Sequence, residues 1–551
     1  MGDNEHGKNG KRDGIIALFL FAALLLPRLA RYFYPEADLE DASYLDIIAC
    51  LSRGQRPYVD FVNTHFVFPE ILLALLYRIT WPTYRVTEAV TALVVTSTAI
   101  VIYFLGKELR SRRLGIIAAA LYATHPIFFK YHLYEKEIYE AFFASLLALL
   151  VWRRRRQHGC AEGRASGLAP EGSRVDRAPF SKTRGLSPLS DVLFWEIDMG
   201  LIMPAALLCF LGFLSKIDFA SQAAFICLYI LVIERRAGDA FAVGVLFLAL
   251  ACATVLALFW AFGKEPLNQI LLFHFFKGRE SLWWHKLYKW VGASGYLFFL
   301  SVGSIPFLGR FWKSPLLYIL FWIAGPLAFF FFVLDTFWVH NIISLMPPFS
   351  ILGAVYIDEC AKWLAALYRQ APNRADMGAS GRRAVFIPVS LALIIIASGF
   401  YVRYMASLRF GFGYASRSQF EKVSALAREN STPGDIIVAP PIVAAVSNRT
   451  DIIHTREIYP VYLWAMSRVR AVGLREARRE ALQSQFRELY SQTANRWTDM
   501  AWEAIESRRA AVVVADPGSA YERFNPDPGR MTKAGYKIIY SDKDYIVWIR
   551  G

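Results

Sequence analysis

The chain has 551 residues, of which 55% are hydrophobic, 15% aromatic and only 19% charged. Soluble domains have about 25% charged residues, so this composition excludes a disordered protein, a coiled coil and a disulfide-rich scaffold. The net charge of +15 comes from 61 basic and 46 acidic residues. The basic residues lie between apolar runs rather than in one domain, which argues against a nucleic-acid partner and for a membrane.

Long apolar runs recur along the chain, and a membrane-spanning helix needs about 20 mostly apolar residues. We expect about 11 spans. The first is not a cleaved signal peptide, because Pro27 and Arg28 follow its apolar run in place of a cleavage site. The predicted spans are 14–33, 86–105, 114–130, 139–152, 199–215, 218–234, 240–262, 293–308, 316–334, 340–357 and 384–404.

The distribution of lysine and arginine between the spans predicts their orientation. One alternating set of loops has 25 basic residues in 97 positions, and the other has 14 in 104. We expect the protein in the inner (cell) membrane, with the loops richer in lysine and arginine on the cytoplasmic side. These loops include 153–190, which begins with four arginines and is expected to be a flexible linker. The N-terminus is then cytoplasmic and the C-terminus extracytoplasmic.

The C-terminal region has a different pattern. Residues 435–439 and 511–515 are short apolar stretches typical of strands, and 536–549 is typical of a hairpin. Polar helical patterns lie near 417–430 and 463–508. The fold class expected is therefore an α-helical polytopic membrane protein, residues 1–405, followed by a small external α/β domain, residues 406–551.

Acidic residues gather in two loops that the topology places outside. Carboxylates near a bilayer are costly and often functional. The external loop 34–85 contains Glu40, Asp41 and Asp60, with Tyr58 and His65 as further candidates. The second acidic loop, between the third and fourth spans, contains Glu135 and Glu137.

Basic and aromatic residues lie on the same predicted side. Lys216 follows the fifth span, His340 begins the tenth, and Arg279 lies in an aromatic-rich loop suited to lipid head groups. A lysine at such a place can bind a phosphate as a point charge. We therefore expect Lys216, His340 and Arg279 to bind the phosphate of a lipid-linked donor.

This set of groups suits transfer of a sugar from a lipid phosphate. One carboxylate, Asp41 or Glu40, would act as general base on an acceptor hydroxyl. The cations would offset the charge that develops on the phosphate leaving group. Since nucleotides are not supplied outside the membrane, a polyprenyl-phosphate-linked sugar is the expected donor. The acceptor can be a glycan, a lipid or a protein.

The ordered motifs resemble those of membrane glycosyltransferases of the GT-C class, especially the family-39 (dolichyl-phosphate-mannose mannosyltransferase-like) and lipid A core glycosyltransferase-like group. The resemblance covers about 15–405. It rests on a first-loop pattern, on Glu137 followed by Phe142-Phe143, on Lys216, and on the stretch from His340 to Pro348. The first-loop pattern is Glu40-Asp41, Tyr44, Ala49, Gly54 and Pro57-Tyr58-Val59-Asp60.

The resemblance implies a GT-C-like catalytic domain and inversion at the anomeric carbon. The family usually has Asp before Glu in its first-loop pair, and the order here is Glu40-Asp41, so either residue can take the place of the base. Some members of the class hold a divalent metal with acids of both loops. Asp41 and Glu137 are the corresponding candidates, and the metal is left open.

Two other functions fit parts of the pattern. A secondary transporter or lipid flippase also carries membrane-embedded acids, but it typically has internal repeats, and none is evident here. A binding or assembly subunit would use 406–551 to recruit a partner. Transfer activity, coupled ion flux and the effect of deleting 406–551 separate these functions from the glycosyltransferase.

Overall fold

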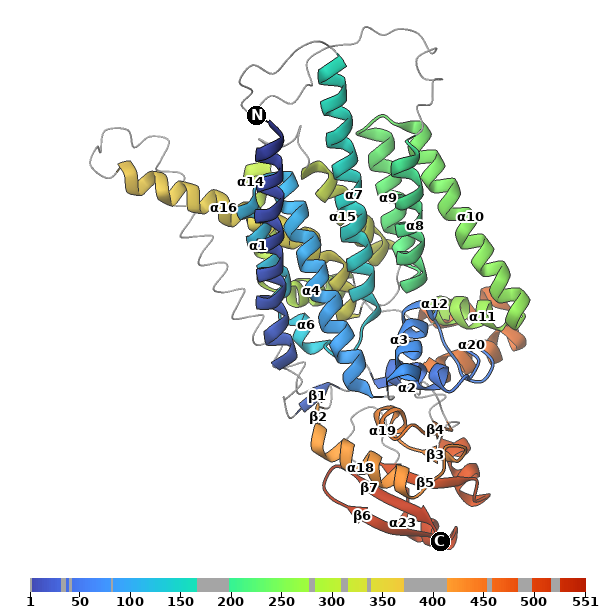
Figure 1. Ribbon diagram of the computed structural model, residues 1–551. Coiled ribbons are helices and arrows are strands. Elements are labelled where there is room, and N and C mark those ends of the chain that lie inside the picture. The colour runs from blue at the N-terminus through green and yellow to red at the C-terminus, as the bar shows by residue number, and fades with distance from the viewer. Residues whose placement is uncertain are drawn as a thin grey trace.

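The computed structural model describes residues 2–30, 36–38, 42–80, 83–165, 198–276, 283–308, 316–333, 338–370, 414–452, 458–483, 498–516 and 526–551. Helices form a bundle, and a small sheet with its own helices lies at one end of it (Figure 1). The N-terminus lies at the opposite end.

The N-terminal part of the bundle consists of long helices connected at the sheet end by short ones (Figure 1). The long helices are α1 (Gly2–Ala30), α4 (Tyr84–Leu109) and α7 (Lys136–Ala165), with α5 (Arg112–Ala123) beside α4. The short helices are α2 (Ala42–Ser52), α3 (Phe68–Ile79) and α6 (Ile127–Lys130).

A tight turn connects α4 to α5. The Ser111 side chain accepts a hydrogen bond from the Leu114 backbone N–H and so caps the start of α5. Gly106 and Gly115 face each other across the pair, and a Cβ on Gly106 would lie only 2.7 Å from the Cα of Gly115. The two helices therefore touch backbone to backbone at this point, in the manner of small residues at membrane helix interfaces.

The next helices complete the bundle. Its outer helix α10 exposes Phe241, Leu248, Leu256 and Trp260 to the surroundings, as a lipid-facing surface requires. The bounds are α8 (Met199–Ser215), α9 (Phe219–Val232), α10 (Ala237–Phe262), α11 (Glu265–Leu267), α12 (Phe273–Phe276), α13 (Trp283–Ser294), α14 (Tyr296–Leu308), α15 (Leu316–Ala328) and α16 (Met346–Gln370). Two π-helical segments, η3 (Asn268–Leu272) and η5 (Phe329–Val333), and a 3-10 helix, η6 (Val339–Leu345), connect them.

Several predicted spans have direct counterparts. Among the described residues, Tyr84–Leu109, Ala237–Phe262 and Val339–Trp363 are long and apolar enough to cross a membrane. A fourth span results if the bent pair Trp284–Ser294 and Tyr296–Phe307, which turns by 94°, counts as one. The predicted span 384–404 lies outside the described residues. The count of about 11 spans therefore stays a prediction.

The sheet at the end of the bundle has five strands in the order β4-β3-β5-β7-β6. β3 (Ile436–Val438) runs parallel to β4 (Thr450–Asp451) and β5 (Ala510–Ala515), whereas β7 (Ile546–Arg550) is antiparallel to β5 and β6 (Tyr536–Ser541). Every residue of β5 is buried, as expected of a central strand covered on both faces. The predicted strands at 435–439 and 511–515 and the predicted hairpin are confirmed.

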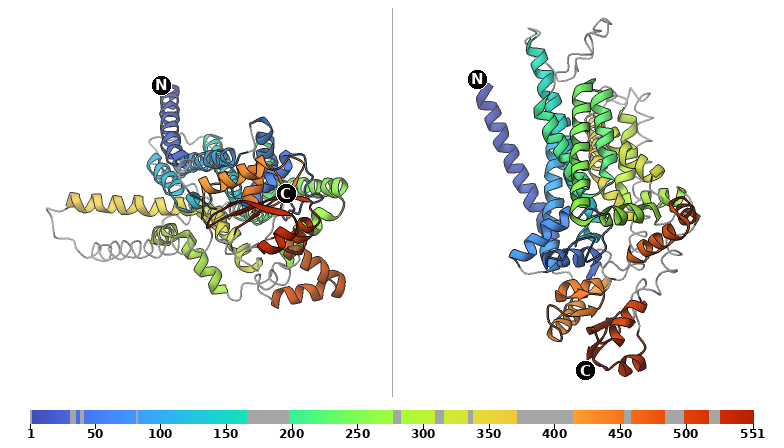
Figure 2. Two further views of the ribbon diagram at one scale, coloured as in Figure 1. Left: turned by 90° about the horizontal axis from the view of Figure 1, so that it is seen from below. Right: turned by 90° about the vertical axis from the view of Figure 1, so that its right-hand side faces the viewer.

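Helices and a second, two-stranded sheet complete the C-terminal part. The helices are α18 (Arg417–Glu429), α19 (Pro441–Ser447), α20 (Ile458–Val472), α21 (Leu474–Gln483) and α23 (Pro528–Lys533). In the small sheet, β1 (Glu36–Asp38) from the first loop pairs with β2 (Tyr414–Ser416). The right-hand view in Figure 2 shows the C-terminal elements at the same end of the bundle as in Figure 1.

Candidate active site

Two acidic residues lie where the chain enters α7. Glu135 directly precedes the helix and Glu137 belongs to its first turn, where a carboxylate interacts favourably with the helix dipole. Each is only 1% exposed. Because α7 begins at the end of the bundle next to the sheet, these carboxylates lie at that end as well (Figure 1).

Lys216 reaches the same place from the end of α8. Its backbone is extended at the C-cap position, with φ of −155° and ψ of 135°. The Lys216 ammonium forms an ion pair with Glu137 Oε1, lies 3.2 Å from Asp218 Oδ2, and donates a hydrogen bond of 2.7 Å to Asn341 Oδ1. The lysine is only 7% exposed. Its ammonium is held in place by groups from three separate segments of the chain.

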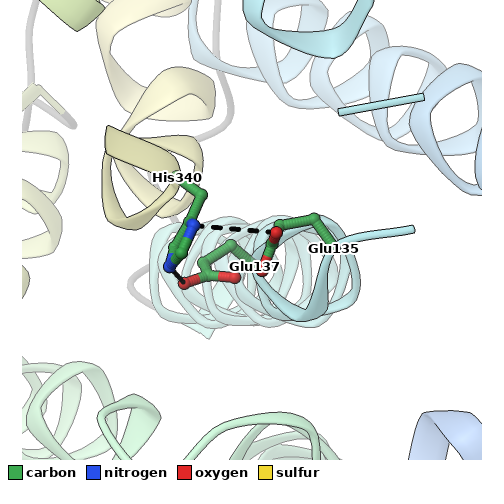
Figure 3. A group of neighbouring side chains, drawn as sticks. All are labelled: Glu135, Glu137 and His340. Carbon is green, nitrogen blue, oxygen red and sulfur yellow. Dashed lines mark ion pairs between the residues drawn. The ribbon is translucent and has the colours of Figure 1, made fainter. Parts of the chain in front are cut away.

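His340 completes the group from the 3-10 helix η6. Its Nδ1 lies 3.7 Å from Glu135 Oε2, and its Nε2 lies 3.7 Å from Glu137 Oε1, so the imidazole bridges both carboxylates (Figure 3). Trp338 stacks on the ring at a centroid distance of 6.3 Å. Tyr131 meets it edge-on at 5.8 Å. These aromatic contacts hold the imidazole over the two acids.

This assembly, here called the Lys216 cluster, has more buried acids than bases. It consists of Glu135, Glu137, Glu140, Lys216, Asp218, His340 and Asn341. Glu140 accepts a hydrogen bond of 2.5 Å from Gln222 Nε2. Burial lowers the pKa of the Lys216 ammonium, but Asp218, Glu137 and Glu140 raise it more, so its pKa lies above the ordinary value. Lys216 is therefore charged at neutral pH, against four carboxyl groups.

Part of the cluster has the donor set of a divalent cation site. Glu135, Glu137 and His340 each offer a ligand atom, and these atoms lie within 4.8 Å of one another. The buried Glu137 Oε2 has no hydrogen-bond partner among the described residues, while Oε1 faces Lys216. Two carboxylates and an imidazole suit zinc or manganese, so these residues fit a divalent ion.

The other predicted site residues lie elsewhere or outside the described residues. Glu40, Asp41 and Arg279 belong to segments that the structure does not describe. Asp60 pairs at 3.0 Å with Arg56 on the surface, and this hydrogen bond lowers the pKa of the Asp60 carboxyl. Tyr58 is buried and donates a hydrogen bond of 2.7 Å to the His65 carbonyl oxygen.

The first loop also contacts the segment after α10. Gln269 of η3 donates to the Tyr58 carbonyl oxygen at 2.8 Å, and the His65 ring lies 4.9 Å from that of His274. Tyr58 has a φ of +67°, which is unusual for a residue with a side chain. The structure thus brings Glu135, Glu137, Lys216 and His340 together and shows Tyr58 and His65 as buried loop residues.

Two buried ion pairs escaped the sequence analysis. Glu70 pairs with Lys136 at 2.7 Å, and Glu88 pairs with Arg417 at 2.8 Å. Glu88 lies inside the predicted span 86–105 and Glu70 inside the apolar stretch 66–80. A carboxylate within such a run is itself a signal, because it requires a buried partner.

No family profile matches the sequence, and no curated protein matches it either. Solved structures with a similar fold do exist. ArnT from Cupriavidus metallidurans in the apo state has a TM-score of 0.56 at 12% identity, with 99% of this chain and 98% of that chain covered. The same protein bound to undecaprenyl phosphate has a TM-score of 0.54 at 11% identity, with 97% of each chain covered.

A more distant likeness is to the oligosaccharyltransferase of Archaeoglobus fulgidus in the apo form. It has a TM-score of 0.49 at 15% identity and covers 97% of this chain and 74% of that one. The similarity to ArnT extends over nearly the whole of both chains. This similarity confirms the GT-C-like fold that the sequence motifs imply. Together with the apolar helices, it supports a multi-pass membrane protein.

Proposed function

We propose that this chain is an integral membrane glycosyltransferase. It moves a sugar from a polyprenyl-phosphate donor to an acceptor hydroxyl at the extracytoplasmic face, with inversion at the anomeric carbon. The observation that carries the proposal is the Lys216 cluster, which places a buried charged lysine and a histidine among carboxylates at one end of the bundle. The ArnT structure of similar fold is bound to undecaprenyl phosphate.

The transfer needs a base and a stabilised leaving group. The carboxylate of Asp41 or Glu40 takes the proton of the acceptor hydroxyl as its oxygen attacks the anomeric carbon. The bond between that carbon and the phosphate oxygen breaks at the same time. The electron pair stays on the polyprenyl phosphate, which needs no protonation to leave.

Cations offset the charge that develops on the leaving phosphate. Lys216 supplies positive charge from the cluster, His340 donates a ring N–H to the phosphate, and Arg279 adds positive charge from the segment before α13. Since Glu137 and Asp218 already lie against Lys216, the lysine acts within an acidic surrounding. A divalent ion held by Glu135, Glu137 and His340, with Asp41 as a further ligand candidate, would supply additional positive charge for the same phosphate.

Transfer assays on the reconstituted protein test the proposal. Purified full-length chain in lipid nanodiscs is given synthetic polyprenyl-phosphate sugars, and acceptor products are identified by mass spectrometry. We expect loss of transfer in Glu40→Gln or in Asp41→Asn, whichever residue is the base. If both variants keep full activity, the assignment of the base is wrong. Ion-coupled transport or lipid translocation without transfer would favour the alternative transporter or flippase.

The sidedness and the domain boundary belong to the same proposal. Residues 1–405 form the membrane catalytic domain, and 406–551 form an extracytoplasmic domain beside the Lys216 cluster. The N-terminus is cytoplasmic, in keeping with the basic loops. Reporter fusions at loop 153–190 and at the C-terminus test this arrangement, and a cytoplasmic C-terminus would contradict it.

A further inference from the structure

The segment that contains the candidate bases is flanked on both sides by contacts to the C-terminal region. On its upstream side, β1 pairs antiparallel with β2, and Asp38, two residues before Glu40, is aligned with Tyr414. On its downstream side, α2 begins at Ala42, directly after Asp41, and packs against α19. Residues far apart in sequence thus meet on either side of the acidic pair.

The upstream contact is fixed to the bundle by a buried arginine. Arg417 follows β2 directly, and its guanidinium donates to both Glu88 oxygens, at 2.8 and 3.1 Å. Both residues are nearly fully buried. The guanidinium also lies 3.2 Å from His132 Nε2, three residues before Glu135. Such bidentate pairs define geometry as well as supplying energy.

Aromatic and polar contacts at the start of α4 support the same junction. The Tyr84 hydroxyl donates to Glu421 at 2.5 Å, and its ring meets Phe420 edge-on at 5.4 Å. Arg85 donates to Glu421 at 3.0 Å. The first turn of α18 is therefore attached to α4, and through His132 to the loop that leads to Glu135.

The downstream contact depends on a residue with left-handed backbone. Asn448 ends α19 with φ of 55° and ψ of 47°. Its side-chain oxygen accepts a hydrogen bond of 3.1 Å from Arg53, at the end of α2. This bond connects the C-terminal region to the second flank of the acidic pair.

We propose that residues 414–448, here called the positioning segment, hold the acidic segment, namely β1 and α2 on either side of Glu40 and Asp41, against the bundle. Arg417 and Asn448 are positioning residues: neither takes part in the chemistry, and each fixes one flank of the candidate bases. This inference rests on the proposed function for its catalytic consequence, although the contacts themselves do not. A base displaced by about 1 Å can cost about 100-fold in rate.

Hydrogen exchange and kinetics on the full-length protein test the proposal together. Arg417→Ala removes the side chain that fixes the end of β2 to Glu88 of the bundle. Asn448→Gly removes the downstream side chain but keeps a residue that accepts positive φ. In either variant we expect exchange about tenfold faster in peptides covering 36–52, because local opening becomes easier, and unchanged exchange in α8 and α9.

The kinetic expectation separates positioning from binding. The kcat of Arg417→Ala should fall about 10- to 100-fold, with the KM for the lipid donor unchanged, and Arg417→Lys should restore part of the loss. Arg509→Ala is the matched control, because Arg509 forms an exposed ion pair with Glu503 at 2.8 Å within the C-terminal region. It should change neither readout.

Two outcomes would overturn the inference. One is unchanged exchange in 36–52 in both Arg417→Ala and Asn448→Gly. The other is faster exchange with wild-type kcat, which would show that the contacts do not serve the reaction. If the wild-type protein transfers no sugar at all, the proposed function fails, whereas the exchange experiment still decides whether the positioning segment holds the acidic segment.

Discussion

Two buried lysines at the same end of the bundle have different surroundings. Lys136, at the start of α7, pairs with Glu70 at 2.7 Å and donates to the Phe66 carbonyl oxygen at 3.0 Å. Its ammonium also lies 5.3 Å from the Tyr44 ring centroid. Lys216 instead faces Glu137 and Asp218, with Glu140 close enough to raise its pKa.

The difference separates a structural ion pair from the site that we propose for the donor phosphate. Lys136 forms its direct ion pair with a single carboxylate, that of Glu70, and this pair fixes α3 against α7. The Lys216 cluster has four buried carboxyl groups beside one lysine, and a single lysine does not offset the desolvation energy of ionising all four. Such an imbalance is typical of sites that receive charge from a substrate or an ion.

The largest effect is expected from Lys216→Met. Removing the only ammonium in the cluster should lower transfer at least about 100-fold, because preorganised positive charge at the leaving phosphate is lost. Initial rates with saturating donor measure the effect. Circular dichroism in detergent reports whether the variant is folded, and a folded variant with wild-type rates would contradict the role given to Lys216.

Lys136→Met should act on stability instead. The substitution leaves Glu70 buried without its cation, which should lower the free energy of unfolding by about 3–5 kcal/mol. The double variant Lys136→Met, Glu70→Leu should recover much of this loss, since both charges are then gone. Thermal unfolding in nanodiscs measures both. A fall in kcat as large as that of Lys216→Met would erase the distinction between the two lysines.

Removal of divalent cations tests whether the acidic groups of the Lys216 cluster hold a metal ion. We expect a chelator to lower transfer and manganese or zinc to restore it. The half-saturating concentration of the ion should rise about 10–100-fold in Glu135→Gln. Isothermal titration with the metal alone gives a readout besides activity. Wild-type transfer at full rate after exhaustive chelation would leave Lys216 and His340 to bind the phosphate without a metal.

The smallest effect is expected at the exposed Arg56–Asp60 pair. Its hydrogen bond lowers the pKa of Asp60 below the unfolded value, so the pair stabilises the fold at neutral pH. The stability difference between the wild type and Asp60→Asn should be small at pH 7 and should shrink below about pH 4 as the carboxyl becomes protonated. Thermal melts over this pH range measure it. A large difference in stability between the two proteins at neutral pH would contradict this expectation, because it would mean that solvent does not weaken the exposed Arg56–Asp60 ion pair.

Local patterns predicted the helices and strands well. The apolar run 240–262 corresponds to α10, and the stretch 511–515 lies within β5. Glu137, Lys216 and His340 were expected at span ends on one predicted side, and they also contact one another in the structure. Alternation of the spans predicts a shared side but not the contact.

Contacts between distant segments could not be predicted in this way. Glu88 and Arg417 are 329 residues apart, and no periodicity links α4 to α18. The pairing of β1 with β2 could not be predicted from sequence either, because a three-residue strand is too short to show an alternating apolar pattern. Which first-loop acid is the base stays a prediction, because Glu40 and Asp41 lie outside the described residues.

The glycine contact between α4 and α5 also fixes how far α5 lies along the axis of α4. Gly106 and Gly115 meet at the end of the bundle far from the Lys216 cluster, and α5 then runs about 18 Å back toward it. Sliding α5 by one residue would shift everything after it by about 1.5 Å, including the turn that presents Glu135. The close contact of two residues without side chains thus fixes the axial position of α5, and with it the position of the turn that presents Glu135 to the Lys216 cluster.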